Sequence, residues 1–409
     1  MPHHDDEHDG GAGRGFGSRA IKAATRTPRV EQGSAAVPIY QSATFHALDV
    51  DDYAELISFR KPGYTYARIE NPTASALAEA FAELHGAEAG FAFGSGMAAI
   101  HATILSLVRA GDRIVSTRAV YGSTRGLLDT VFARLGVAVT YVDATDHDAV
   151  AAALAAAPTR LLYAETIANP TIVVADLVRL AELGHRHGAV VAVDNTFASP
   201  YLCQPHSLGV DLVIESATKW LSGHSDVIAG VVAGRREDIE AIRAVSIDTG
   251  GIAAPFSAFL VLRGLQTLHV RMDRHGQSAL TLARQLESAT AVQSVAYPGL
   301  PSHPQATVAQ RQLRSGGGIM AFDLGTRTAA AAFIDALRIP PVTATLGSVV
   351  TYAVHPPTAT HRQLDEEQLR AAGIPPGLVR LSVGLEDVDD LVADVDQALT
   401  QSLAPGARA

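Results

Sequence analysis

The sequence predicts an α/β protein: a mostly parallel, seven-stranded sheet flanked by helices, followed by a smaller α+β C-terminal domain. Three observations predict this architecture. From about Ile69 onward, short apolar runs alternate with segments of amphipathic helical period. The apolar runs are typical of strands buried on both faces of a parallel sheet. After about Pro255 the alternation ends, and helices and strand-like pieces are mixed.

The predicted sheet is built from strands that follow one another with helices between them. The strand segments, some running on into a loop, are residues 89–93, 113–122, 137–143, 160–170, 189–197, 211–219 and 226–234. The helical segments are residues 73–88, 96–112, 123–136, 148–159 and 174–188. Gly86 and Gly111 are expected to stop two of these helices, because glycine adopts the left-handed conformation found there.

The C-terminal part has a different pattern. Residues 257–288 predict one long helix, with a bend allowed, that bridges the two domains. Two strands and two helices are expected after it. The strands are residues 294–299 and 318–325, and the helices are residues 328–337 and 388–403.

Composition limits the classes of partner and compartment. The formal net charge of −10 argues against nucleic acid or an anionic membrane as the main partner. No apolar run is long enough to span a membrane, and no secretory signal is visible. The single cysteine, Cys203, excludes an intramolecular disulfide and fits a cytoplasmic protein. His3, His4 and His8 predict a frayed tail, and we expect no metal site.

One lysine stands out because lysines are scarce. The chain has only Lys22, Lys61 and Lys219 against 29 arginines. Arginine replaces lysine on a surface, but its guanidinium does not deprotonate and is no amine nucleophile. Lys219 follows an apolar strand and lies in the polar segment "ESATKWLSGHSD". We therefore expect Lys219 to carry out chemistry.

Several polar residues follow the predicted strands, where α/β sheets bind ligands. Asp194 ends the strand "AVVAVD" and either caps the next turn or meets a cation. Paired with Lys219, it suggests a pyridoxal site, in which the lysine forms a Schiff base and the aspartate keeps the pyridine nitrogen protonated. A phosphate would lie at the helix start in "FGSGMAAI", against the backbone N–H groups of Gly96 and Met97. Ser216 and Thr218 are either further hydroxyl donors or plain strand-end residues.

Four more residues have both a structural and a functional interpretation. Tyr121 either packs or stacks on the pyridine ring. Tyr66 and Arg68, in "GYTYARIENPT", are too exposed for core residues, and Arg68 is suited to clamp a phosphate, either in its own subunit or in a neighbouring one. Arg380, in the alternating strand "GLVRLSVGLED", is either an ion-paired structural residue or a clamp for a substrate carboxylate.

Over nearly the whole chain, about residues 37–399, these residues resemble the Cys/Met metabolism family of fold type I pyridoxal-phosphate enzymes. That family contains methionine γ-lyases, cystathionine γ-lyases and γ-synthases, and homoserine-ester sulfhydrylases. The motifs that carry the resemblance are "YTYARIENPT", "FGSGMAAI", "YGST", "ETIANP", "VDNTFASPYL", "ESATKWLSGHSDVIAG", "RGLQTLHVRMDRH" and "RLSVGLED".

The resemblance implies a role for each candidate residue, with pyridoxal 5′-phosphate as cofactor. Lys219 is the Schiff-base lysine, Asp194 the partner of the pyridine nitrogen, and Tyr121 the ring-stacking and proton-transfer tyrosine. The phosphate cradle is formed by Gly96, Met97, Ser216 and Thr218. The adjacent protomer donates the pair Tyr66 and Arg68. The contacts to the substrate come from Arg380, Thr345, Asn169 and Ser123.

The resemblance also implies an assembly and a domain division. Family members are homotetramers built from catalytic dimers that share active sites. Residues 1–60 are then a tail and arm that contribute to the neighbouring subunit, residues 61–258 bind the cofactor, and residues 259–409 form the C-terminal domain.

Departures from the family patterns bear on the substrate. Ala344 stands where cystathionine-type enzymes have a glutamate, which favours a methionine γ-lyase type. Ser123 replaces a cysteine and Ser246 a lysine that such lyases use. Sulfhydrylases share the "GST" and "GLPSHPQ" segments but have asparagine in place of Thr345. We favour γ-elimination on a sulfur-containing amino acid such as methionine; the alternative is γ-replacement on an O-acyl-homoserine.

Two other classes are disfavoured. A non-catalytic homologue would not need Lys219, Asp194 and Arg380 together. An aminotransferase or decarboxylase of the same fold does not fit the segment "SATKWLSGHSD".

Overall fold

The large sheet has seven strands, as predicted, and one of them is antiparallel. The computed structural model describes residues 15–26 and 34–402; the predicted histidine tail at residues 3–8 lies outside them. The strands run in the order β1-β7-β6-β5-β4-β2-β3, and β7 is antiparallel to both of its neighbours. Their bounds are β1 Ala89–Phe93, β2 Arg113–Thr117, β3 Ala138–Val142, β4 Leu161–Glu165, β5 Val190–Asp194, β6 Leu212–Glu215 and β7 Gly230–Gly234.

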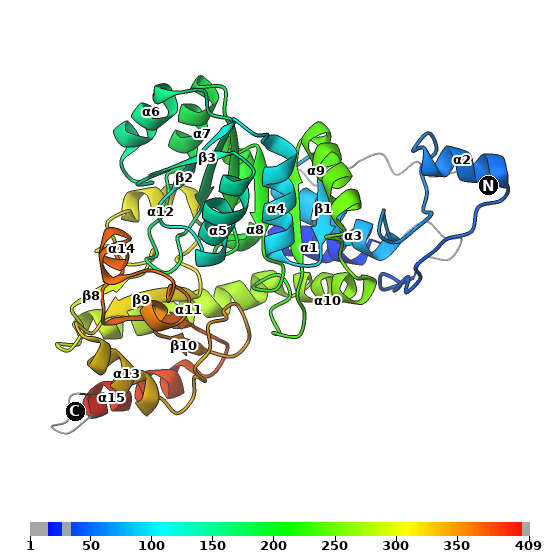
Figure 1. Ribbon diagram of the computed structural model, residues 1–409. Coiled ribbons are helices and arrows are strands. Elements are labelled where there is room, and N and C mark those ends of the chain that lie inside the picture. The colour runs from blue at the N-terminus through cyan, green and yellow to red at the C-terminus, as the bar shows by residue number, and fades with distance from the viewer. Residues whose placement is uncertain (1–14, 27–33, 403–409) are drawn as a thin grey trace.

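Helices cover both faces of this sheet (Figure 1). On one face, α4, η1 and α9 pack on one core, and on the other face α1, α3, α6, α7 and α10 pack on a second. Strands β4 to β7 are buried almost throughout, which explains their continuously apolar sequences. The helices are α1 Phe16–Thr25, α3 Pro72–His85, α4 Gly96–Leu107, α5 Gly122–Gly126, η1 Leu127–Phe132, α6 His147–Ala156, α7 Leu177–Arg186, α8 Ser199–Leu202, η2 Pro205–Leu208, α9 Arg236–Thr249 and α10 Pro255–Leu265.

Local sequence signals set the ends of α3, the helix that leads into β1. The side chain of Asn71 accepts a hydrogen bond from the Thr73 N–H, and Pro72 occupies the first turn. Gly86 ends the helix at φ 67°, in the left-handed region, as predicted.

The predicted bridging helix is present but is interrupted. Helix α10 ends at Leu265, and α11 runs over Leu268–Ser288, with Thr267 in a non-helical conformation between them. The first turns of α11 pack in the core of the large domain and its later turns in the core of the C-terminal domain. One helix therefore fixes the two domains relative to each other.

The C-terminal domain is an antiparallel sheet backed by helices, as predicted in outline. Its strands run in the order β10-β11-β9-β8, and α11, α13 and α15 pack on them. The bounds are β8 Ser294–Ala296, α12 Ala306–Gln312, β9 Ile319–Asp323, α13 Arg327–Ala336, β10 Tyr352–Val354, η3 Pro356–Thr358, α14 Glu366–Ala371, β11 Leu378–Ser382 and α15 Val388–Ser402.

Several predicted bounds were wrong. Helix α4 ends at Leu107, short of Gly111, because Val108 is extended. The segment 123–136 divides into α5 and the π-helical turn η1. Strand β7 begins at Gly230 instead of residue 226. Tyr121 does not end a strand, since β2 stops at Thr117 and Tyr121 caps α5.

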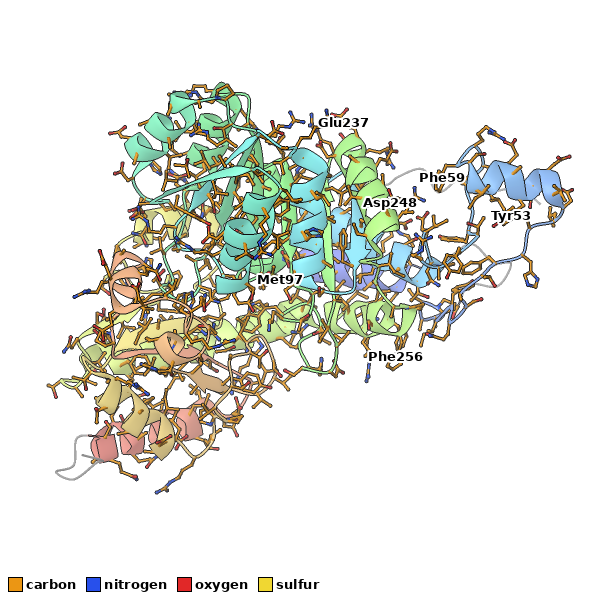
Figure 2. All side chains as sticks on the ribbon, viewed as in Figure 1. Tyr53, Phe59, Met97, Glu237, Asp248 and Phe256 are labelled. Carbon is orange, nitrogen blue, oxygen red and sulfur yellow. The ribbon has the colours of Figure 1, made fainter. Side chains whose placement is uncertain are left out.

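The arm before α3 stands away from the body. Helix α2 (Val50–Ile57) has no buried residue in this chain, and Leu48 and Val50 are 88% and 85% exposed. Figure 2 shows Tyr53 on this arm, outside the two domains. Phe59, just after α2, reaches back to the large domain, where the guanidinium of Arg243 lies 4.5 Å from its ring. Exposed apolar surface of this kind is typical of contacts with another subunit or protein.

Candidate active site

A cavity of about 240 Å³ opens where the carboxyl ends of the sheet face the C-terminal domain. Most of the predicted site residues line it, although they come from distant parts of the sequence. They are Gly96, Met97, Tyr121, Asn169, Asp194, Ser216, Thr218, Lys219 and Arg380. The convergence follows from the topology, because parallel strands bring their carboxyl ends to one edge.

Lys219 lies in the turn after β6 and is largely shielded from water. Its Nζ donates a hydrogen bond to Thr345 Oγ1 at 3.0 Å. Burial, and then the positive charge of Arg380, lower the pKa of Lys219 to about 8. At this pKa about a tenth of the amine is uncharged at pH 7 and about half at pH 8, which provides the free amine that a nucleophile or base requires.

Asp194 and Glu165 place two carboxyl groups side by side at the ends of neighbouring strands. The two residues are register partners in the parallel pair β4–β5, and both line the cavity. Asp194 Oδ1 accepts a hydrogen bond from the Thr196 N–H at 2.9 Å. Burial raises the pKa of Asp194, and burial followed by the Asp194 charge raises the pKa of Glu165. A cation in contact with Asp194 would relieve this cost.

The start of α4 forms a backbone cradle suited to an anion. Ser95 caps the helix by accepting a hydrogen bond from the Ala98 N–H, and Met97 lies at the end of α4 nearest the C-terminal domain (Figure 2). The N–H groups of Gly96 and Met97 belong to the first turn, where a helix offers no partner to its donors. A Cβ on Gly96 would lie 2.8 Å from the Cβ of Ser216, so only glycine allows this approach.

The two hydroxyl residues before Lys219 differ. Ser216 lines the cavity next to Gly96, and its backbone N–H donates to Thr196 Oγ1. The Thr218 hydroxyl donates to the Ala229 carbonyl at 3.2 Å and accepts from the Ala229 N–H at 3.1 Å. Thr218 must rotate before it can donate to an anion in the cavity, whereas Ser216 has no such competing bond.

Arg380 is a buried cation, 1% exposed, that reaches the cavity from β11. Its Nη1 donates to Asn169 Oδ1 at 2.8 Å, and its Nη2 donates to the carbonyls of Ala344 and Thr345. Nε has no partner. Among the described residues, no carboxylate forms an ion pair with Arg380, so the structure excludes the ion-paired interpretation there. Burial lowers the pKa of Arg380 to about 10, and a bound carboxylate would compensate this buried charge.

Four predicted residues do not line the cavity of their own chain. Thr345 is the nearest of them, since its hydroxyl contacts Lys219; the other three lie further out. Ser123 is exposed on the first turn of α5. Tyr66 is exposed, and Arg68 hydrogen-bonds the carbonyl of Ile247, remote from Lys219. The guanidinium of Arg68 stacks over the Tyr66 ring at 5.6 Å. The pair is thus held together and faces outward.

The sequence interpretation missed several lining residues. Phe197, Ile228 and Leu346 supply apolar walls. Glu165 is the first residue of the motif "ETIANP", but the sequence indicated no role for it. Ser95 was visible as a possible helix cap, since serine before an apolar helical segment is a common start signal.

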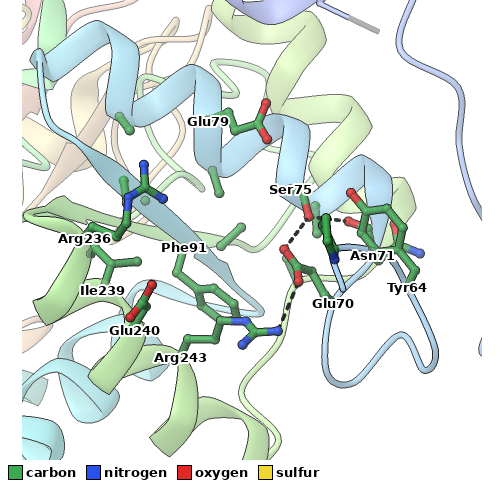
Figure 3. A pocket seen from close by; sticks show the side chains of 18 of the residues that line it. Tyr64, Glu70, Asn71, Ser75, Glu79, Phe91, Arg236, Ile239, Glu240 and Arg243 are labelled. Atoms are coloured by element: carbon green, nitrogen blue, oxygen red, sulfur yellow. Dashed lines mark hydrogen bonds and ion pairs between the residues drawn. The ribbon is translucent and has the colours of Figure 1, made fainter. Parts of the chain in front are cut away.

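A larger cavity, about 1360 Å³, lies elsewhere, between α3, α9 and the segment before α3. Figure 3 shows Glu70 joined to both Ser75 and Arg243 in its wall. Its charged side chains are exposed or half-buried and several are paired with each other. Two lysines line it, Lys22 and Lys61, but both are exposed, and Lys61 forms an ion pair with Asp52. We therefore assign the chemistry to the smaller cavity.

Two kinds of feature are not found within residues 15–26 and 34–402. No group of three or more metal-ligating side chains has the arrangement to hold an ion. No helix in these ranges combines the length and the apolar character needed to cross a membrane.

Comparisons with known proteins agree on one family. The sequence model of the Cys/Met metabolism PLP-dependent enzymes matches residues 17–400. The chain is 42% identical to L-methionine gamma-lyase of Pseudomonas putida, over 95% of this chain and 98% of that protein. It is 41% identical to O-succinylhomoserine sulfhydrylase of Pseudomonas aeruginosa, over 95% and 96%. Cystathionine gamma synthase of Xanthomonas oryzae, solved with aminoacrylate and cysteine, superposes with a TM-score of 0.90 at 34% identity, over 95% of this chain and 98% of that one.

Proposed function

Because the chain belongs to the Cys/Met metabolism PLP-dependent enzyme family, we propose that it is a carbon–sulfur lyase acting by γ-elimination. Its substrate is a γ-substituted, sulfur-containing L-amino acid such as methionine. With one water consumed, the products are a 2-oxo acid, ammonia and a thiol. The observation that carries this proposal is the cavity shared by the partly deprotonated Lys219 and the buried, unpaired guanidinium of Arg380.

The residues present fit pyridoxal 5′-phosphate. The first-turn N–H groups of Gly96 and Met97, with Ser216, would hold its phosphate, because these donors have no partner within the helix. Asp194 would hold a proton at the ring nitrogen, and Tyr121 would stack on the ring. Lys219 would bind it covalently. When bound, the cofactor supplies a link to the substrate amino group and an electron sink for charge that develops at Cα and Cβ.

The side chains of this protein then have distinct tasks. Arg380 binds the substrate carboxylate, helped by Asn169, and so orients Cα toward Lys219. The Nζ of Lys219 takes the proton from Cα, would pass that proton to the cofactor, and as a free amine again takes one from Cβ. Its pKa of about 8 allows both roles near neutral pH. Tyr121, which lines the same cavity, donates a proton to the leaving sulfur. Thr345 Oγ1 accepts from Nζ and keeps the amine pointed into the cavity.

The cavity walls favour a short apolar side chain. Ala344, Leu346 and Ile228 line it, and none offers a charge to the far end of a substrate such as cystathionine. Several L-methionine gamma-lyases among the relatives, at about 40% identity, support the same substrate class.

The alternative is γ-replacement on an O-acyl-homoserine, in which sulfide or a thiol bonds to Cγ after the acyl carboxylate has left. In the elimination Cγ takes only a proton, and water releases the amino group as ammonia. The O-succinylhomoserine sulfhydrylase relative, at 41% identity, is as similar to this chain as the lyases are. Both outcomes use the same proton transfers by Lys219 until the leaving group departs, and they differ in what then bonds to Cγ.

One experiment separates these outcomes. The holoenzyme is given methionine, cystathionine or O-succinylhomoserine, each with and without sulfide, and 2-oxo acid and sulfur products are measured. We expect 2-oxo acid and thiol from methionine without sulfide. Product formed only from the ester together with sulfide would refute the lyase. Lys219→Ala must abolish turnover, while Lys22→Ala, a matched change at an exposed lysine on α1, must not.

The proposal also covers the assembly of the subunits and the cellular compartment of the protein. We propose a homotetramer of catalytic dimers, in which the arm around α2 packs on a neighbour and Tyr66 and Arg68 complete the neighbour's site. The exposed apolar arm and the outward-facing pair support this assembly. We also propose a cytoplasmic location, where the single buried thiol of Cys203 stays reduced.

A further inference from the structure

Glu165, at the carboxyl end of β4, joins two parts of the site that are far apart in sequence. Its Oε1 accepts the backbone N–H of Tyr121 at 2.6 Å, and its Oε2 accepts the backbone N–H of Asn169 at 3.1 Å. The side chain is 6% exposed and lies at the cavity wall. Both carboxyl oxygens are thus engaged with main-chain donors on two different loops.

Each of these main-chain N–H groups belongs to a residue of the proposed site. Tyr121 begins α5 and presents its ring to the cavity. Asn169 accepts from Arg380 Nη1 at 2.8 Å through its side-chain Oδ1. A continuous set of three hydrogen bonds therefore runs from Tyr121 through Glu165 and Asn169 to Arg380.

A carboxyl group suits this position better than the other side chains of its size. Two N–H donors converge on it, and a glutamine amide would offer an acceptor oxygen to only one of them. Loss of the side chain would leave both N–H groups without this acceptor in a buried place, which is costly. Asp194 lies beside Glu165 in register, and burial together with the Asp194 charge raises the pKa of Glu165.

We propose that Glu165 is a positioning residue that fixes the ring of Tyr121 and the guanidinium of Arg380 relative to each other. The proposal rests on the roles proposed above for Tyr121 and Arg380. It adds that one buried carboxyl group sets the distance between the stacked face of the cofactor and the site of the substrate carboxylate.

The test measures ligand binding, so that it does not depend on turnover. L-norvaline has the α-amino and α-carboxyl groups of the substrate but no γ-leaving group. Its Kd is measured on the holoenzyme from the change in the visible spectrum, and the visible circular dichroism reports how the cofactor ring sits against Tyr121. For Glu165→Ala we expect a rise in Kd of about tenfold or more, as one lost charge-assisted contact gives, together with a weaker visible dichroism band.

Two further variants keep the test sharp if Glu165→Ala is unstable. Glu165→Gln retains one acceptor oxygen. It should therefore change either the norvaline Kd or the dichroism as much as Glu165→Ala does, but not both. The matched control is Asp394→Asn in the C-terminal domain. Asp394 is also buried and also accepts backbone N–H groups, from Arg338 and Ile339, but it lies outside the cavity. The control should lower the melting temperature and leave the norvaline Kd unchanged.

A double-mutant cycle tests the connection through Asn169. Asn169→Ala removes the bond to Arg380, so Glu165→Ala should raise the norvaline Kd less than twofold further in that background. Additive effects would overturn the linkage, and so would an unchanged Kd in folded Glu165→Ala or an equal change in Asp394→Asn. A wild-type protein that bound neither pyridoxal phosphate nor norvaline would refute the proposed function itself, which is a different result.

Discussion

Gly96→Ala should weaken the binding of pyridoxal phosphate, because the new methyl group would occupy space that the cradle needs. It would lie 2.8 Å from Ser216 Cβ and 3.1 Å from Ser216 Oγ, whereas ordinary carbon contacts begin near about 3.5 Å. Ser216 is anchored by its N–H bond to Thr196 Oγ1, so the start of α4 must move instead. The displacement needed is roughly 0.7 Å, and it carries the N–H groups of Gly96 and Met97 with it.

The magnitude follows from the cost of overpacking, which is typically about 1–3 kcal/mol. If that cost falls on the cradle, the Kd for pyridoxal phosphate rises between about 5-fold and about 150-fold, at 1.4 kcal/mol per factor of ten. The assay titrates the apoprotein with cofactor and follows quenching of the fluorescence of Trp220, the only tryptophan.

The matched control is Gly126→Ala at the end of α5. A Cβ there meets nothing within 4 Å, and alanine is the better helix former. This variant should bind the cofactor as the wild type does. If Gly96→Ala also bound pyridoxal phosphate within twofold of the wild type, the assignment of the α4 start as the phosphate site would be wrong.

Three other predictions concern the remaining groups of the site. In the apoprotein, modification of Lys219 by an amine reagent should increase as pH rises through about 8, because the reactive free amine forms there. Peptide mass spectrometry distinguishes modified Lys219 from modified Lys22 and Lys61. If Lys219 showed the same pH profile of modification as Lys22 and Lys61, the lowered pKa would be contradicted. Arg380→Met should raise KM for the amino acid by about 10- to about 150-fold, the value of one charge-assisted contact; a KM within twofold of wild type would exclude the clamp. Inactive Arg68→Ala and Lys219→Ala subunits, dissociated and mixed in equal amounts, should recover about a quarter of wild-type sites if each site uses both subunits of a dimer; no recovery would show that Arg68 serves no shared site.

The sequence was sufficient for the sheet and for the centre of the site. Strands buried on both faces must be continuously apolar, so β4, β5 and β6 were visible as strands, and polar residues at their ends were visible as exceptions. Asp194 was predicted in this way and Lys219 mainly from the scarcity of lysines, and both line one cavity.

Other features depend on contacts that no local pattern encodes. The role of Glu165 rests on two main-chain N–H groups, one of which, that of Tyr121, lies 44 residues away. The hydroxyl of Thr218 is engaged with Ala229 across a turn, which the spacing to Lys219 does not reveal. The interruption at Thr267 lies inside an otherwise unbroken helical pattern, which allows a bend but does not show where it falls.

The covalent attachment of the cofactor is the most direct test of the account. The protein is loaded with pyridoxal phosphate, reduced with borohydride, digested and examined by mass spectrometry. Since the chain has only three lysines, the site of attachment is unambiguous. We expect the phosphopyridoxyl group on Lys219 alone; its presence on Lys22 or Lys61 instead, or its absence from Lys219, would contradict the account.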